Sequence, residues 1–76
     1  MEMLKKISDI FGVEAEKISL ETAPGDFPEW DSLGHLNLLT SLEEEFKISF
    51  DMDEIMSIQS INDLKNILEK KEVDWS

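Results

Sequence analysis

Apolar residues recur at helical spacing in four stretches of the 76-residue chain. In the first stretch, Leu4, Ile7 and Phe11 follow one another at intervals of three and four. This spacing places side chains on one face of an α-helix. Gly12 then supplies a natural C-terminal stop. Read in this way along the chain, the pattern predicts helices over residues 1–12, 32–47, 52–58 and 60–71.

The expected helix over 32–47 carries a leucine-rich stripe. Its inward-facing residues are expected to be Leu33, Leu36, Leu39, Leu42 and Phe46, with Leu38 widening the stripe. Burial of each leucine contributes about 1.5–3 kcal/mol, so we expect this helix to be the central one. Asp31 and Ser32 are both good N-cap residues, and the sequence does not choose between them.

The remaining segments read as connections. Residues 13–31 form a long loop with two prolines and a glycine, and loops of this length in a compact domain are often functional. The tail over 72–76 is expected to fray, although Val73 and Trp75 could fold back. Two short segments alternate between apolar and polar residues, 18–20 and 48–50, but they are too short and isolated to form a sheet. The pattern therefore predicts one all-α domain over 1–76, a small four-helix bundle with three longer helices and a short third one.

The chain is strongly acidic, with 18 Asp and Glu residues, 7 basic residues and a net charge of −11. This charge excludes ordinary nucleic-acid binding and argues against attraction to an anionic membrane surface. It favours partners with basic patches, although it also serves simply to keep a small protein soluble. The chain has no apolar run long enough to span a membrane and no signal-peptide pattern, so we expect a cytoplasmic protein.

Few residues offer metal or catalytic chemistry. The chain has no cysteine, which excludes disulfides and thiolate metal sites. The acidic run from Asp51 to Glu54 suggests calcium, but an EF-hand loop needs glycine at its sixth position and glutamate at its twelfth. Met56 and Asn62 stand at those positions. An EF-hand is therefore not expected, and only weak divalent binding by clustered carboxylates stays open.

Asp31, Ser32 and His35 have the residue types of a catalytic triad. Neighbours on one helical turn do not readily adopt nucleophile–base–orienter geometry, so we expect no enzyme and a partly exposed His35 beside Ser32. A serine at a helix N-terminus has an accessible hydroxyl, and the nearby backbone N–H groups suit an attached phosphate. Ser32 therefore fits either a modified serine or a plain N-cap.

The segment DSLGHLNLLTSLEEEF, from Asp31 to Phe46, closely resembles the acyl carrier protein family. The resemblance extends over nearly the whole chain, including its size, its acidity and the long loop before the motif. It implies that a phosphopantetheinyl transferase attaches 4′-phosphopantetheine from coenzyme A to Ser32. The thiol of this arm would carry an acyl or aminoacyl group as a thioester, which explains how a chain without cysteine could serve thioester chemistry. A non-catalytic, monomeric carrier is expected.

The resemblance also implies roles for other residues of this sequence. Matching positions on the second helix and just before it contact the transferase and other partner enzymes, here Asp31, Leu33, Leu36, Thr40, Glu43 and Glu44. Phe50 and Ile58 match apolar positions near a pocket that shelters an acyl chain. Glu43 and Glu44 lie near the C-terminal end of the helix, where the helix dipole disfavours negative charge. They form either a functional surface or a solvated face.

The front of the second helix departs from the pattern of fatty-acid carriers. Gly34, His35 and Asn37 stand where those carriers usually have acidic residues, and Trp30 precedes the motif. These features resemble specialised carriers that serve polyketide, peptide or surface-polymer pathways. A housekeeping fatty-acid carrier and an unmodified acidic interaction module are the alternatives. Failure to accept phosphopantetheine would favour the second of these.

Overall fold

The computed structural model describes residues 2–75, and within them it contains four α-helices, one short 3-10 helix and no strand. The elements are α1 Glu2–Phe11, η1 Ala15–Lys17, α2 Ser32–Phe46, α3 Met52–Ser57 and α4 Ile61–Lys70. The expected all-α architecture is confirmed, and the described helix ends lie within one residue of the expected ones. Met1 and Ser76, which the expected first helix and tail included, lie outside the described residues.

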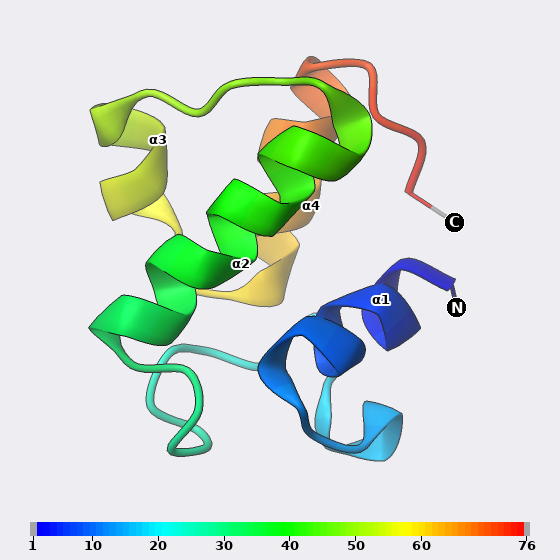
Figure 1. Cartoon of the computed structure of the whole chain (residues 1–76), viewed down its shortest axis with the longest axis vertical. Coiled ribbons are helices and arrows are strands. Elements are labelled where there is room, and N and C mark those ends of the chain that lie inside the picture. Colours follow the sequence, from blue (N-terminus) through cyan, green and yellow to red (C-terminus); the bar gives the residue numbers. More distant parts are fainter. Residues whose placement is uncertain (1, 76) are drawn as a thin grey trace.

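Helix α2 crosses the centre of the molecule (Figure 1). In this view α4 lies behind α2, while α1 and α3 lie on opposite sides of it. The buried side chains that join these elements are Met3, Ile7, Phe11, Ile18, Phe27, Trp30, Leu38, Leu39, Leu42, Phe50, Ile58, Ile61, Leu64, Leu68 and Val73. Helix α3 contributes no buried residue, and its Ile55 packs half-buried against this core.

The leucine stripe expected on α2 is only partly correct. Leu38, Leu39 and Leu42 are buried, but Leu33 and Leu36 are 77% and 51% exposed. Each step of three residues falls about 60° short of a full helical turn, so Leu33 lies about 120° around the helix from Leu39. Helix α2 therefore has an inner apolar face and a separate, exposed apolar face near its N-terminus.

The long loop before α2 is tied to the rest of the molecule. Its carbonyl groups at Leu20 and Thr22 accept hydrogen bonds of 2.9 Å from the backbone N–H groups of Asn62 and Ile61, at the start of α4. These bonds satisfy donors that a helix N-terminus otherwise leaves unpaired. The side chain of Trp30 is 1% exposed and anchors the end of the loop in the core.

The C-terminal tail folds back. The Val73 side chain is buried, and its backbone N–H donates a 2.9 Å hydrogen bond to the carbonyl of Leu68 in α4. Trp75 packs half-buried against the core. The described residues of the tail therefore fold back instead of fraying as expected, because burial of Val73 and its hydrogen bond to α4 hold them against the core.

Candidate functional site

The start of α2 is capped by Asp31. This residue has an extended backbone, and its Oδ1 accepts a 2.8 Å hydrogen bond from the Gly34 backbone N–H. Ser32 is therefore the first residue of the helix and not its cap. Its side chain is exposed, and its hydroxyl forms no hydrogen bond within residues 2–75. The structure thus leaves the Ser32 hydroxyl accessible and uncommitted.

Gly34 allows the loop to pass close to the first turn of α2. A Cβ atom at this position would lie far inside van der Waals distance of the Glu29 carbonyl oxygen and 3.3 Å from Asp31 Oδ1. The sequence indicated only a weaker helix here. A glycine in the first turn after a proline-rich loop is a signal for such a close approach, because glycine lacks Cβ.

His35 joins the loop to α3. Its Nδ1 accepts a 3.0 Å hydrogen bond from Trp30 Nε1–H, and its Nε2 lies 2.9 Å from the carbonyl oxygen of Ile55. The neutral tautomer with its proton on Nε2 satisfies both contacts, because one nitrogen must accept and the other must donate. The rings of His35 and Trp30 also stack, with centroids 6.1 Å apart.

These contacts explain why Asp31, Ser32 and His35 do not act as a triad. Both nitrogens of the His35 ring are engaged by groups other than Ser32, and Asp31 caps the helix. In a serine triad the histidine instead accepts the hydroxyl proton and is oriented by the carboxylate. The arrangement presents a hydroxyl without activating it as a nucleophile.

An open pocket of about 470 Å³ lies beside Ser32. It is lined by Pro24, Trp30, Asp31, Ser32, His35, Ile55, Met56 and Ile58. Of the two residues suggested for an acyl pocket, Ile58 belongs to this lining. Phe50 does not; it is buried elsewhere, with the Lys71 ammonium 5.7 Å from its ring centroid.

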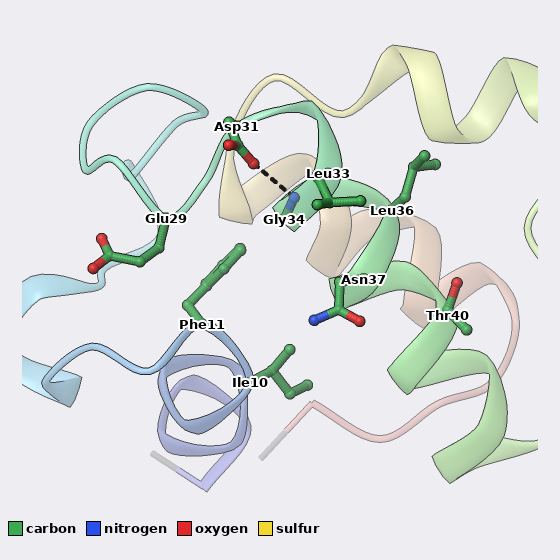
Figure 2. A pocket seen from close by; sticks show the side chains of 9 residues that line it. All are labelled: Ile10, Phe11, Glu29, Asp31, Leu33, Gly34, Leu36, Asn37 and Thr40. Carbon is green, nitrogen blue, oxygen red and sulfur yellow. Dashed lines mark hydrogen bonds between the residues drawn. The ribbon is translucent and has the colours of Figure 1, made fainter.

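A groove of about 620 Å³ runs between α1 and α2 (Figure 2). Four of the suggested partner-contact residues line it, namely Asp31, Leu33, Leu36 and Thr40. Figure 2 shows Ile10 of α1 on the opposite wall. The exposed apolar residues of α2, Leu33 and Leu36, therefore lie on the same surface as its N-cap residue, Asp31.

The remaining suggested contacts, Glu43 and Glu44, differ in their surroundings. Glu43 is half-buried, and its Oε2 accepts a 2.7 Å hydrogen bond from the Phe50 backbone N–H, which fixes the connection from α2 to α3. The next residue but one, Glu45, forms a 3.1 Å ion pair with Lys6. Glu44 is exposed and forms no side-chain bond within residues 2–75. Of these three carboxylates, Glu44 is the one open to a partner.

Asp51 and Glu54, the two ends of the acidic run, form a capping box at the start of α3. Asp51 Oδ1 accepts from the Glu54 backbone N–H at 2.8 Å, and Glu54 Oε1 accepts from the Asp51 backbone N–H at 3.0 Å. The Asp51 N–H and the Lys71 ammonium, 3.0 Å from Oε1, together hold the pKa of Glu54 below its usual range. Among the described residues, no group of three or more His, Cys, Asp or Glu side chains is arranged to hold a metal ion.

None of the described helices is long and apolar enough to cross a membrane.

In comparisons with known proteins, a family model described as "Phosphopantetheine attachment site" matches residues 1–68. Two curated relatives are similar over most of their length. An "Acyl carrier protein homolog" of Mycoplasma genitalium is 35% identical, over 95% of both chains. An "Acyl carrier protein" of Clostridium acetobutylicum is 34% identical, over 82% of this chain and 80% of that protein.

The fold has a matching solved structure. The solution NMR structure of a holo acyl carrier protein from Geobacter metallireducens superimposes with a TM-score of 0.81 and 33% identity, over 93% of this chain and 83% of that chain. The cofactor and the non-catalytic role expected from the Asp31-Ser32-Leu33 motif agree with these matches. The chain therefore belongs to the acyl carrier protein family, whose members are non-catalytic carriers with covalently bound 4′-phosphopantetheine.

Proposed function

We propose that Ser32 carries the 4′-phosphopantetheine arm and that the chain presents an acyl or aminoacyl thioester to enzymes of a specialised biosynthetic pathway. The observation that supports this assignment is that capping and exposure fall to two different residues at the start of α2. Asp31 provides the cap, and the adjacent Ser32 hydroxyl is exposed and uncommitted. When bound, the arm supplies a thiol that forms the thioester.

The attachment reaction requires little from this chain except an accessible hydroxyl. A phosphopantetheinyl transferase joins Ser32 Oγ to the pantetheine-bearing phosphorus of coenzyme A. The pyrophosphate bond breaks, adenosine bisphosphate leaves, and the serine proton is lost. The N-terminus of α2 offers backbone N–H groups and a positive dipole end to the resulting phosphodiester. The chain's own contribution is to position the hydroxyl and stabilise the added charge.

We propose that partner enzymes dock on the groove surface formed by Leu33, Leu36 and Thr40, with Asp31 and the exposed Glu44 as charged contacts. A net charge of −11 steers encounter with basic patches and weakens it as salt rises. Glu43 is a weaker candidate for such a contact, because the Phe50 N–H already occupies one of its oxygens. Fast, weak association suits a carrier that must leave each enzyme.

The neutral front of α2 supports a specialised partner set rather than the housekeeping fatty-acid enzymes. An acidic side chain in place of Gly34 would meet the Glu29 carbonyl. A carboxylate in place of His35 could not donate to the Ile55 carbonyl. The internal structure of this chain therefore favours a helix front without the acidic residues usual in fatty-acid carriers.

We further propose that the carrier is a monomer in the cytoplasm. Its large negative charge opposes association between copies. A chain without cysteine has no need of an oxidising compartment.

The test is intact mass after incubation with coenzyme A, magnesium and a broad-specificity transferase. Wild type and Ser49→Ala, which removes another exposed serine, should each gain one phosphopantetheinyl group. Ser32→Ala should gain none and keep its circular dichroism spectrum. No gain in wild type, with a transferase shown to be active on another carrier, would contradict the assignment and favour an unmodified interaction module. Unfolding of Ser32→Ala would instead indicate a structural serine.

A further inference from the structure

The His35 side chain closes the junction between α2 and α3 beside the proposed attachment site. It lies one turn after Ser32, and both residues line the same pocket. Its two ring contacts bind Trp30 of the loop and the Ile55 carbonyl of α3. Within residues 2–75, the contact with Ile55 is the only hydrogen bond that joins α2 directly to α3.

Helix α3 has little else to hold it in place. It is six residues long and contributes no fully buried side chain. Its other polar contact with a distant segment is the half-buried ion pair between Glu54 and Lys71, which joins α3 to the end of α4 and not to α2. Beside the half-buried packing of Ile55 on the core, the His35 bond is therefore the polar contact that positions α3 against α2.

The interior behind this junction is filled. The Trp30 indole is 1% exposed, and the neighbouring Ile58 is 4% exposed. Leu38, one turn beyond His35 on α2, is fully buried. An acyl chain carried on Ser32 that passed between α2 and α3 would have to displace the His35 ring. This would leave the Trp30 N–H and the Ile55 carbonyl without their hydrogen-bond partner. The Trp30 N–H belongs to a buried side chain, and leaving such a donor unpaired is costly.

We propose that His35 is a positioning residue that keeps the space between α2 and α3 closed, so that the acyl group stays in the surface pocket beside Ser32. This inference rests on the proposed attachment of the arm to Ser32. The pocket offers Met56, which is 75% exposed, and the edge of Ile58 as apolar contacts. These surfaces suit a short acyl group and give a long saturated chain little shelter.

The experiment compares acyl forms of the whole chain. Butanoyl, octanoyl and dodecanoyl arms are loaded from the acyl-coenzyme A compounds, loading on Ser32 is verified by mass, and Tm is measured by circular dichroism. In wild type, Tm should change by less than about 2 °C across the series. An enclosed chain would instead raise Tm with length, by about 10 °C or more for dodecanoyl over butanoyl, because each buried methylene stabilises the fold.

Two substitutions separate positioning from general stability. His35→Phe keeps a ring against Trp30 but removes both hydrogen bonds, so the dodecanoyl form should now exceed the butanoyl form in Tm. His35→Gln keeps one donor and one acceptor in its amide. Its Tm should therefore depend on acyl length nearly as little as that of wild type. A uniform loss of Tm in His35→Phe, with no dependence on acyl length, would show a merely structural histidine and overturn the proposal.

The wild-type series decides the matter even if His35→Phe does not fold. A wild-type Tm that rises with acyl length would show that the interior is open with the histidine in place, and would overturn this inference alone. Absence of any loading would overturn the attachment to Ser32 and this inference together. The mass measurement distinguishes the two failures.

Discussion

Replacement of Gly34 by alanine tests whether the loop before Ser32 is held against α2. Alanine raises helix propensity by about 1 kcal/mol relative to glycine. The new Cβ, however, would lie far inside contact distance of the Glu29 carbonyl oxygen, 3.2 Å from its carbon and 3.3 Å from Asp31 Oδ1. The obstacle is mainly backbone, so the loop has to move, and overpacking of this kind costs about 1–3 kcal/mol. The two effects oppose each other.

We expect the steric cost to exceed the gain, so that Gly34→Ala lowers the free energy of unfolding by about 1 kcal/mol and Tm by about 4–8 °C. Urea denaturation, followed by circular dichroism, measures the first quantity directly. Asn37→Ala is the matched control, because Asn37 is exposed on the same helix. It should raise stability by up to about 0.7 kcal/mol through propensity alone. A Gly34→Ala variant as stable as Asn37→Ala would refute the close approach of the loop.

Two further substitutions test the helix caps. Asp31→Ala removes the cap of α2 and should lower stability by about 1 kcal/mol, whereas Asp31→Asn keeps an acceptor for the Gly34 N–H and should unfold close to wild type in urea. If the charge of Asp31 contacts the transferase, Asp31→Asn should nevertheless accept phosphopantetheine more slowly in a timed mass assay; an unchanged rate would remove that contact from the docking surface. Glu54 has a lowered pKa in the folded chain, chiefly through the Asp51 N–H and then through Lys71. Its stabilising contribution is therefore fully present above the unfolded value of 4.5 and is lost as pH falls through the lower folded pKa. Glu54→Gln should be less stable than wild type at neutral pH, and the difference in urea midpoint should vanish in acid; a difference that persists below the folded pKa would contradict this linkage.

Much of the site was predictable because its signals are local. The Asp31-Ser32-Leu33 motif and the apolar periodicity after it indicate a serine at the start of a helix, and the structure has α2 begin at Ser32. The choice of cap was not predictable, since Asp31 and Ser32 are equally suitable residue types. It depended on the extended backbone of Asp31, which aims its carboxylate at the Gly34 N–H.

Other features of the site depend on segments that are distant in the sequence. The exposure of Leu33 and Leu36 follows from where α1 and the loop lie against α2, and periodicity does not report that placement. The acceptor of His35 is a backbone carbonyl twenty residues away. Every residue has such a carbonyl, so residue types alone do not identify this partner. Glu43 is a similar case, because its acceptor role toward the Phe50 N–H depends on the path of a connecting segment.

The sequence by itself determined the helices, the acidic surface and the serine that stands at the start of the central helix. These depend on the spacing of apolar residues, on summed charge and on a short motif, and each is a property of neighbouring residues or of totals. The local backbone conformation decided that Asp31 and not Ser32 caps α2, and only the tertiary structure decided that Gly34 admits the loop and that His35 joins Trp30 to α3. The physical reason is that steric contact and hydrogen bonding act over a few ångströms in space, and the folded chain alone brings these groups together.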